Sequence, residues 1–401
     1  MQRRHFIRNS SITLGGLLLQ NELMSSTAHF ADDKINIGVI GVGSRGKGLL
    51  SVMMDLQDKF TITAVCDVLD FRFKEAKEEY KSETVKEYRD YRKLLDDQSI
   101  QAVVIATPLY LHFQMAADAL KAGKHVYLEK TMTYSIPQAI ELVKLSKMHN
   151  KQVLQVGHQL GYTPLYIRVK EMIEKGYLGK ITQVDCRYDR HDDWRRQVPD
   201  PALEKAINWR MYKAYSGGLT AEILSHQMQF INWALGTHPD EVFSTGGIDF
   251  YKDGRETYDN VQIMLRYQKE GIVGNFGSTI SNEREGFIFK IKGSKGTVEL
   301  LLDQGLYYPE QETKKQLETV DGVAGATKIE WKKDGGIAIL DEKTKEGTWF
   351  AFKDFHHCIA EKKRAQCDVV AGAKAAIVVH LANTALYTHT VQRWKPEYNF
   401  V

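Results

Sequence analysis

The sequence predicts an α/β protein in two parts. The first is an N-terminal Rossmann domain on a doubly wound parallel sheet, and the second is an α+β domain with a large, mostly antiparallel open sheet. Three observations predict this class: strand-like and helix-like segments alternate between residues 35 and 156, a glycine-rich turn follows the first strand, and strands of alternating polarity dominate after about residue 160. We expect the domains to span residues 33–157 and 158–401.

A glycine-rich turn, GVGSRG at residues 41–46, lies between a short apolar strand and a helical pattern. Gly41 permits the tight turn, Gly43 permits close approach of a pyrophosphate, and Gly46 permits the helix to pack on the strand. The N–H groups at the helix start, around Ser44 and Arg45, then face the phosphates. Strand, turn and helix together predict a dinucleotide site; a glycine-rich turn without a ligand is the alternative.

An acidic residue ends the second apolar strand. Asp67 follows residues 62–66, about 20 residues after the last glycine of the turn, where a carboxylate can accept from both ribose hydroxyls of an adenosine. The same carboxylate would repel a 2′-phosphate, so NAD is favoured over NADP. Arg45 and Arg72 could each reach a 2′-phosphate, which keeps NADP as the second choice.

The rest of the first domain continues the alternation. Unbroken apolar runs predict strands covered on both faces at residues 102–106, 125–128 and 153–156, and helical spacing predicts helices at 71–80, 88–95, 111–121 and 136–149. The carboxyl ends of such strands share the edge of the sheet where ligands bind. The residues expected on the cofactor side of this edge are Thr107, Pro108, His112, Glu129, Lys130 and His158.

The second half of the sequence shows strands of alternating polarity in place of the unbroken apolar runs of the first half. After a predicted helix at 164–175, alternating strands are expected at 181–187, 242–249, 260–267, 272–280, 287–292 and 297–301, separated by glycine-containing turns. Residues 303–348 are polar and glycine-rich and have no clear assignment. A strongly apolar helix at 371–389 is expected to lie buried between the two domains.

Composition restricts the class of protein. The chain has 401 residues, 26% charged and 43% hydrophobic, with a formal net charge of +3. These values are typical of a globular protein and do not suggest a nucleic-acid partner. The four cysteines, Cys66, Cys186, Cys358 and Cys367, show neither C-x-x-C spacing nor a disulfide framework.

The first 28 residues read as a targeting segment. Arg3-Arg4-His5-Phe6-Ile7-Arg8 resembles the twin-arginine export motif, residues 11–19 are apolar but too few to span a bilayer, and Ser26-Thr27-Ala28 offers small residues for a signal peptidase. We expect cleavage after Ala28, export in the folded state to the periplasm, and no integral membrane segment in the mature chain. A cytoplasmic protein with a basic N-terminus is the alternative.

Several motifs together resemble the Gfo/Idh/MocA family, the oxidoreductases that include glucose-fructose oxidoreductase and inositol 2-dehydrogenase. The matching pieces are the glycine turn, Cys66-Asp67, Ala106-Thr107-Pro108 with His112, residues 122–126 leading into Glu129-Lys130, Gly176-Tyr177-Leu178-Gly179, and Ser216-Gly217-Gly218 with His226. The resemblance implies an NAD(P)-binding Rossmann domain, a second domain with a large open sheet, a substrate between them, and a homo-oligomer.

The resemblance also implies three catalytic residues. Lys130 corresponds to the family's active-site lysine, His226 to its catalytic histidine, and Glu222 to its usual aspartate. A neutral histidine can accept the hydroxyl proton of a secondary alcohol, a carboxylate one helical turn away can fix its tautomer, and an ammonium can polarise the alcohol oxygen. Thr131 replaces the family's proline. Lys130 could instead be a surface lysine and His226 a core histidine. Glu222 and His226 could be half of a metal site, but no third ligand has suitable spacing, so no metal is expected.

The best candidate for substrate contact is the aromatic and charged stretch 187–215. Sugars are commonly held by an aromatic face and by charged groups that bind the hydroxyls. A solvated loop is the alternative. The predicted substrate-binding residues are Lys130, Tyr162, Arg190, His191, Trp194, Trp209, Arg210 and His226.

These features predict an NAD-dependent oxidoreductase that transfers a hydride between the nicotinamide and a secondary hydroxyl or ketone of a sugar, glycoside or polyol, with C3 of a glycoside as one case. One alternative is a hydrolase resembling glycoside hydrolase family 109, which uses NAD transiently for oxidation and elimination. Another is a non-catalytic protein that keeps a bound dinucleotide.

Overall fold

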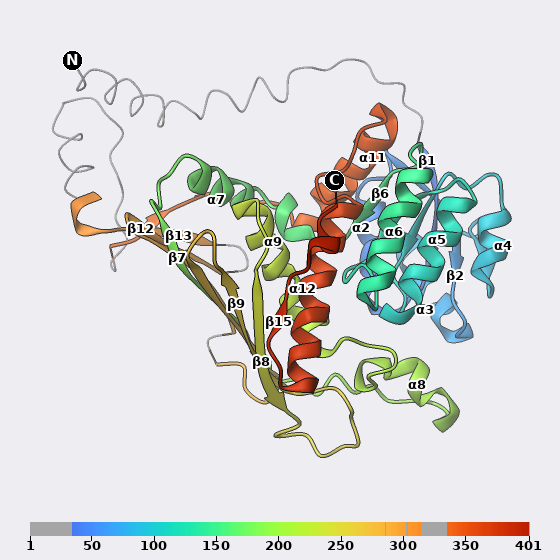
Figure 1. Ribbon diagram of the computed structural model, residues 1–401. Helices are drawn as coiled ribbons and strands as arrows, with labels where there is room; N and C mark the ends of the chain where they lie inside the picture. The colour runs from blue at the N-terminus through green and yellow to red at the C-terminus, as the bar shows by residue number, and fades with distance from the viewer. Residues whose placement is uncertain (1–33, 285, 302–303, 314–334, 401) are drawn as a thin grey trace.

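The structure is a computed structural model that describes residues 34–400 except 285, 302–303 and 314–334 (Figure 1). The twin-arginine segment and the cleavage site expected after Ala28 lie outside the described residues. Two sheets organise the described chain, and the described cysteines are all free and buried.

The first sheet has six parallel strands in the order β3-β2-β1-β4-β5-β6, the Rossmann order. The long apolar runs form its centre: the four residues of β4 are all buried, as expected for a sheet covered on both faces. The strands are β1 (Ile35–Ile40), β2 (Phe60–Cys66), β3 (Lys86–Tyr88), β4 (Ala102–Ile105), β5 (His125–Leu128) and β6 (Leu154–Val156).

Helices connect these strands and cover the sheet, each burying one apolar side. Helix α6 shows two start signals, since the Ser135 side chain accepts a hydrogen bond from the Gln138 N–H and a proline stands in the first turn. The helices are α2 (Ser44–Met54), α3 (Asp70–Tyr80), α4 (Tyr91–Asp96), α5 (His112–Lys121) and α6 (Ile136–Met148).

One expectation for this region was wrong. Residues 88–95 were expected to form one helix, but residues 86–88 form the edge strand β3 and the helix begins only at Tyr91. The side chain of Asp90 accepts a hydrogen bond from the Arg92 N–H and so caps the helix start. The spacing of Tyr88 with Tyr91 and Leu95 imitates a helix turn but spans this boundary.

The second sheet has nine strands in the order β14-β13-β12-β11-β7-β10-β9-β8-β15. It is mostly antiparallel, as expected, with β7 and β10 paired in parallel. Two strands, β13 and β14, come from the region 303–348 that the sequence left unassigned. The strands are β7 (Ile181–Tyr188), β8 (Glu241–Gly247), β9 (Asn260–Tyr267), β10 (Ile272–Thr279), β11 (Phe287–Gly293), β12 (Gly296–Leu300), β13 (Gly305–Pro309), β14 (Ile337–Ala338) and β15 (Gln392–Arg393).

The described helices lie on one face of this sheet, and none of them covers the other face, which we call the open face (Figure 1). Phe243 on β8 and Met264 on β9 are cross-strand neighbours and are 41% and 48% exposed on the open face. The helices that follow β6 in the chain are α7 (Pro164–Glu174), α8 (Glu204–Ile207), α9 (Ser225–Leu235), which follows a π-helical turn Thr220–Leu224, α11 (Gly347–Glu361), which packs against α2 of the first half, and α12 (Val369–Thr388).

Helix α12 lies between the two sheets (Figure 1). It packs against α6 and β6 on one side and against α9 and β8 on the other. Gly372 brings it close to the first sheet, because a Cβ there would lie 2.5 Å from a methyl carbon of Val156. Among the described residues, α12 is the one helix long and apolar enough to cross a membrane, but 72% of that stretch is buried inside the protein. Its apolar character therefore reflects a core position.

Candidate active site

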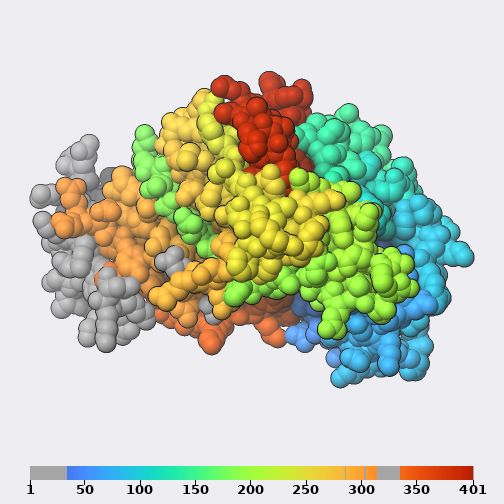
Figure 2. All heavy atoms as spheres, turned by 90° about the horizontal axis from the view of Figure 1, so that it is seen from below, coloured from blue at the N-terminus to red at the C-terminus, as the bar shows by residue number. Residues whose placement is uncertain are grey.

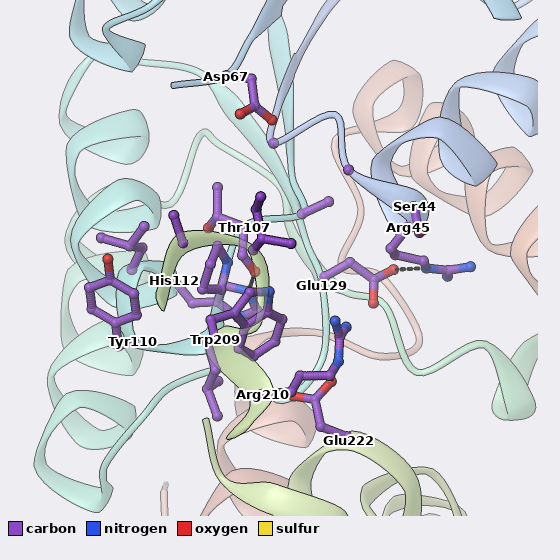
Figure 3. Close-up of a pocket in the computed structure, with 18 of the residues that line it drawn as sticks. Ser44, Arg45, Asp67, Thr107, Tyr110, His112, Glu129, Trp209, Arg210 and Glu222 are labelled. Atoms are coloured by element: carbon purple, nitrogen blue, oxygen red, sulfur yellow. Dashed lines mark hydrogen bonds and ion pairs between the residues drawn. The ribbon is translucent and has the colours of Figure 1, made fainter. Parts of the chain in front are cut away.

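A cleft of about 740 Å³ runs along the carboxyl edge of the first sheet. One wall comes from the glycine turn and the ends of β2, β4 and β5, and the other from residues 190–226. Figure 2 shows the yellow-green segment near residue 200 lying against the blue N-terminal part of the chain. In Figure 3, Asp67 lies toward one end of the pocket and Glu222 toward the other. The volume is in the range of small-ligand sites.

The glycine turn has the geometry that a dinucleotide requires. Gly41 has φ +87°, and a Cβ there would lie 2.7 Å from the carbonyl oxygen of Ala106. A Cβ on Gly46 would lie 2.0 Å from the carbonyl oxygen of Gly41, so Gly46 serves packing and does not line the cleft. A Cβ on Gly43 would meet nothing within 4 Å. Gly43 and Ser44 do line the cleft, and α2 has no side-chain cap. The free space at Gly43 and the helix start fit a diphosphate.

Asp67 lies at the end of β2 and lines the same cleft. Its two carboxylate oxygens accept hydrogen bonds from the N–H groups of Val42 (2.9 Å) and Leu69 (3.0 Å). Partial burial raises the pKa of Asp67, and these hydrogen bonds oppose the rise. The carboxylate is therefore fixed to the glycine turn at the position where an adenosine ribose is expected.

Arg72 also lines the cleft, but its guanidinium has a partner. Its Nη1 lies 2.8 Å from Oε2 of Glu75, and Nζ of Lys47 lies 2.9 Å from the same oxygen. Arg45 likewise donates from Nε to Oε1 of Glu129 at 2.7 Å (Figure 3). Both arginines that could reach a 2′-phosphate thus contact carboxylates.

Lys130 lies at the end of β5 and lines the cleft near His226 and Glu222. Its Nζ donates to the backbone carbonyl of Glu222 at 2.8 Å. Burial lowers the pKa of Lys130, against the opposing charges of Glu222 and Glu129. The next residue, Thr131, follows a cis peptide bond and donates from Oγ1 to the carbonyl of Ala221 at 3.1 Å. This strand end is therefore joined to the segment that carries Glu222 and His226.

His226 lies in the first turn of α9 and lines the cleft. Its Nδ1 is buried and has no hydrogen-bond partner among the described residues, and burial lowers its pKa well below the usual value. The expected pairing with Glu222 is not formed. Oε2 of Glu222 instead lies 2.8 Å from Nε of Arg210, whose charge, with that of Lys130, lowers the pKa of Glu222 against the effect of burial. The i and i+4 spacing predicted the right neighbourhood but the wrong partner.

Two residues that were predicted to contact cofactor or substrate, His158 and Tyr162, lie in the core beside the cleft. His158 is fully buried, and its Nδ1 lies 3.8 Å from Sγ of Cys367. Tyr162 is 5% exposed, and its hydroxyl accepts from the Cys367 N–H at 2.9 Å. Neither residue lines the cleft. The chain turns inward after β6, so both side chains point into the core.

His112 braces two strand ends. Its Nδ1 lies 2.8 Å from the carbonyl oxygen of Thr131 and its Nε2 lies 2.9 Å from that of Thr107. Burial lowers the pKa of His112, although both carbonyls favour a proton on the ring. Thr107, Pro108 and His112 line the cleft as expected, with His112 engaged in supporting its floor.

The stretch after β7 supplies most of the second wall. Arg190, Trp194, Trp209 and Arg210 line the cleft, whereas His191 is exposed outside it and pairs with Ser281 in an isolated bridge. Neighbouring residues of an extended segment point to opposite sides, which separates Arg190 from His191. The Arg210 guanidinium lies 4.2 Å from the centre of the Trp209 ring. Part of this stretch therefore lines the cleft, as the prediction of substrate contact requires.

Sequence reasoning missed Tyr110, which lines the cleft and is 38% exposed. Its ring meets that of Tyr215 edge to face at 4.8 Å between centres. Tyr110 could have been predicted as a residue of the cleft, because it comes just after Thr107 and Pro108 at the end of a strand. No cluster of three or more metal-binding side chains occurs among the described residues.

Two family profiles match the chain. The profile described as the oxidoreductase family with an NAD-binding Rossmann fold matches residues 35–158, and that of the GFO/IDH/MocA C-terminal domain matches residues 166–299. Together they cover more than half of the sequence and both sheets.

Curated relatives and solved structures agree with these profiles. Inositol 2-dehydrogenase/D-chiro-inositol 3-dehydrogenase of Lactiplantibacillus plantarum is 30% identical over 152 residues, 38% of this chain and 43% of the relative. Levoglucosan dehydrogenase of Pseudarthrobacter phenanthrenivorans is 26% identical over 293 residues, 66% of this chain and 73% of the relative.

A structure of levoglucosan dehydrogenase in complex with NADH and levoglucosan superposes with a TM-score of 0.72 at 19% identity, over 90% of this chain and 99% of that chain. At this identity the likeness concerns the fold. This chain matches three curated relatives, two inositol dehydrogenases and one uncharacterized oxidoreductase, over only 38 to 54% of their own length. With both profiles matched in order and both sheets in place, the chain belongs to the Gfo/Idh/MocA oxidoreductase family.

Proposed function

We propose that this protein is an NAD-dependent oxidoreductase that transfers a hydride between the nicotinamide and a secondary hydroxyl or ketone of a sugar, glycoside or polyol. One observation carries the proposal. Lys130, from the first sheet, and His226, from the second half, line the same cleft as Gly43 and Asp67. A dinucleotide held at the turn and at Asp67 would extend along the strand ends toward these two side chains.

The residues of the first sheet fit the cofactor. Gly43 and the start of α2 would hold the diphosphate, and Asp67 the adenosine ribose. Arg45 and Glu129, which form an ion pair, both line the cleft, and Glu129 directly precedes Lys130 in the chain (Figure 3). The bound nicotinamide would supply the hydride acceptor or donor. The relative levoglucosan dehydrogenase, whose structure contains NADH, supports this choice of cofactor.

Lys130 and His226 suit an alcohol oxidation. Burial lowers the pKa of His226, which keeps the imidazole neutral and able to accept the hydroxyl proton but makes it a weaker base than an exposed histidine. Its orphaned Nδ1 leaves Nε2 as the nitrogen available to the cleft. The ammonium of Lys130 can stabilise negative charge that develops on the same oxygen. Both groups need to contact one hydroxyl, and the cleft that they share permits this.

The second wall suits a polyhydroxylated ligand. Trp194, Trp209 and Tyr110 offer ring faces for C–H surfaces, and Arg190 and Arg210 offer guanidinium donors for hydroxyls. Relatives named for inositol and levoglucosan support a sugar-like substrate. Oxidation at C3 of a glycoside remains one case within this proposal.

Purified protein tests the proposal. We expect denaturation to release NAD(H), and myo-inositol, levoglucosan or a methyl glycoside to change the redox state of the nicotinamide in wild-type protein but not in a Lys130→Met/His226→Ala variant. Equal turnover by that variant would contradict it. Release of the aglycone from a chromogenic glycoside without added NAD would favour the hydrolase alternative, and a protein that holds nicotinamide but changes none of these compounds would favour a binding role.

We also propose export to the periplasm and homo-oligomerisation. Arg3-Arg4 and the apolar stretch that follows support export, which cell fractionation with an Arg3→Lys/Arg4→Lys variant would test. The open face around Phe243 and Met264 supports association of two copies, because exposed neighbouring apolar side chains on a sheet favour a partner. Sedimentation of a Phe243→Glu/Met264→Glu variant would test this.

A further inference from the structure

Two histidines meet edge to face beside the cleft. The ring of His158, which follows β6, lies 5.8 Å from that of His226 between centres, with the planes at 83°. His158 is fully buried and does not line the cleft, whereas His226 does. His158 therefore contacts the candidate base from the core side.

Each of these rings has one buried nitrogen without a partner among the described residues. In His226 it is Nδ1, and in His158 it is Nε2. Buried polar atoms are rarely left unbonded, and an ordered water is the commonest partner when no protein group is available. Two hydrogen bonds of about 2.9 Å to one water, at the roughly tetrahedral angle of water, place the two outer nitrogens about 4.7 Å apart. Rings whose centres lie 5.8 Å apart permit this separation between their nitrogens.

The carboxylate expected to orient His226 is engaged elsewhere. Glu222 lies 2.8 Å from Arg210 and leaves Nδ1 of His226 without an acceptor. A neutral histidine that accepts a proton at Nε2 must carry its own proton at Nδ1 and needs an acceptor there. The ring of His158 is a neighbour of the His226 ring, and its Nε2 also lacks a partner among the described residues.

Cys367 fixes the other side of His158. Its Sγ lies 3.8 Å from Nδ1 of His158, within reach of a hydrogen bond to sulfur. Its backbone is fixed as well: the Cys367 N–H donates to the Tyr162 hydroxyl at 2.9 Å, and its carbonyl accepts from the Val156 N–H at 2.8 Å. Burial raises the pKa of the Cys367 thiol, so the sulfur stays uncharged.

We propose that His158 is the positioning residue of His226 and takes the place of Glu222: Nδ1–H of His226 donates to a buried water, and that water donates to Nε2 of His158. The arrangement requires the His158 proton at Nδ1, where it faces Sγ of Cys367. Every nitrogen of both rings then has one role, and Nε2 of His226 is left as the acceptor that faces the cleft. The inference deepens the proposed function and rests on it for its catalytic meaning. No described third ligand supports a metal in place of the water.

Nuclear magnetic resonance of ¹⁵N-histidine-labelled full-length protein tests the proton positions without any substrate. We expect both His158 and His226 to carry their proton at Nδ1 in the wild type, with signals assigned by single substitution. His158→Phe keeps a ring but removes both nitrogens, and it should convert His226 to a mixture of tautomers. A wild-type His226 with its proton at Nε2, or an unchanged tautomer in His158→Phe, would overturn the proposal.

A second pair of variants separates positioning from folding. His158→Gln keeps a polar atom near Nε2, and Cys367→Val removes the sulfur that faces Nδ1. We expect the Gln variant to retain the wild-type His226 tautomer and the Val variant to shift the proton of His158 away from Nδ1 in part of the molecules. If His158→Phe does not fold, the same conclusion rests on these two variants. His380→Gln is the matched control. His380 is a partly buried histidine of α12 that forms a hydrogen bond with the backbone carbonyl of Thr133, and its substitution should leave the His226 signals unchanged.

Steady-state kinetics, with myo-inositol or levoglucosan as the probe, test whether this positioning affects catalysis. We expect His158→Phe to lower kcat by about 10- to 100-fold with KM and the NADH dissociation constant nearly unchanged, and His158→Gln to recover most of kcat. Equal losses in kcat and in cofactor affinity for both variants would mean a merely structural role. If the wild type changes none of the probes, the proposed function fails, and if His226→Ala itself remains active, the proposed role of His226 fails. In both cases the tautomer measurement still decides whether His158 orients His226.

Discussion

Nζ of Lys130 and the backbone carbonyl of Glu222 are joined by a hydrogen bond of 2.8 Å. The bond connects the end of β5 to the π-helical turn that precedes α9, and Thr131 makes a second bond to the neighbouring Ala221. The two walls of the cleft are therefore connected at the point where the chemistry is proposed. Lys130 is held with its ammonium beside His226 and has only one of its three protons committed to this carbonyl.

The first prediction concerns Lys130. Lys130→Met should lower kcat by about 100-fold or more, because a charge that stabilises the developing alkoxide is lost, while NADH still binds. Stopped-flow or steady-state turnover of the probe sugar, with NADH fluorescence titration, measures both.

Lys124 provides the matched control. It is also buried, and its Nζ donates to the carbonyls of Asp97 and Ile100, away from the cleft. Lys124→Met should cost about 1–3 kcal/mol of unfolding free energy and leave kcat per folded molecule unchanged. If both variants lose activity equally, Lys130 has no special role.

The second prediction concerns the pair of Arg210 and Glu222. Arg210→Met leaves a nearly buried carboxylate without its partner and should destabilise the protein by about 3 kcal/mol. Arg210→Met/Glu222→Gln removes both charges and should restore part of that loss. A double-mutant cycle in urea should give a coupling energy of about 1–3 kcal/mol. A coupling near zero would show that the two charges are independent in solution.

The sequence predicted the first sheet well, because its strands are buried on both faces and read as unbroken apolar runs. Strand β3 was missed since it has three residues, all polar or aromatic, at the edge of the sheet. Strands β9 to β12 were predicted by their alternation, which a sheet with one open face produces. The parallel pairing of β7 with β10 leaves no such local signal, because it depends on how distant segments meet.

The place of a residue in the cleft was predictable where the residue directly follows a predicted strand. The glycine turn, Asp67 and Lys130 all lie at strand ends that the pattern located. The partner of Glu222 was not predictable, since Arg210 lies 12 residues away in a separate 3-10 turn, Trp209–Met211, and Glu222 itself lies in a π-helical turn. Which of Arg190 and His191 faces the cleft depends on where β7 ends, and the sequence does not define that to one residue.

The third prediction is a pH dependence of stability. Burial lowers the pKa of His380 to about 4, against its bond to Thr133, whereas an unfolded histidine titrates near 6.5. Between these values the unfolded state binds more protons, so stability that is present above pH 6.5 is lost as the pH falls. The contribution of His380 to this loss should reach about 3 kcal/mol near pH 4.

Urea unfolding at pH 7 and pH 4.5 measures this contribution. The free energy of unfolding should fall less between these pH values in His380→Gln than in wild type, by about 2 kcal/mol. His357, which is exposed on α11, provides the control, and His357→Gln should behave as wild type. An identical loss in all three proteins would assign the acid sensitivity to other groups.

The fourth prediction concerns cofactor choice. Asp67→Ser removes the charge that would repel a 2′-phosphate, and Glu75→Gln releases Arg72, whose Nη1 now lies 2.8 Å from Glu75. The double variant should change the ratio of NADPH to NADH affinity by about 10-fold or more in favour of NADPH, equal to about 1.4 kcal/mol. Glu78→Gln, an exposed change on the same helix, should leave the ratio unchanged. An unaltered ratio in the double variant would mean that the adenosine ribose does not lie at Asp67.

The last prediction compares three glycines, at which substitution by alanine should affect either the stability of the fold or the affinity for NADH. A Cβ at Gly43 meets nothing within 4 Å and φ there is −69°, so Gly43→Ala should fold normally while its methyl group occupies the space proposed for the diphosphate. The NADH dissociation constant should rise about 10-fold or more. Gly46→Ala places a Cβ 2.0 Å from the Gly41 carbonyl oxygen and should cost about 3 kcal/mol or more.

Gly48 is the control, because it lies in the same helix, outside the cleft, with nothing within 4 Å of a Cβ. Gly48→Ala should stabilise α2 by about 0.5–1 kcal/mol and leave NADH affinity unchanged. Thermal unfolding and fluorescence titration of the three variants distinguish the cases. Since Gly43→Ala changes neither backbone conformation nor packing, unchanged NADH affinity in that variant would place the diphosphate away from this turn and would contradict the cofactor site itself.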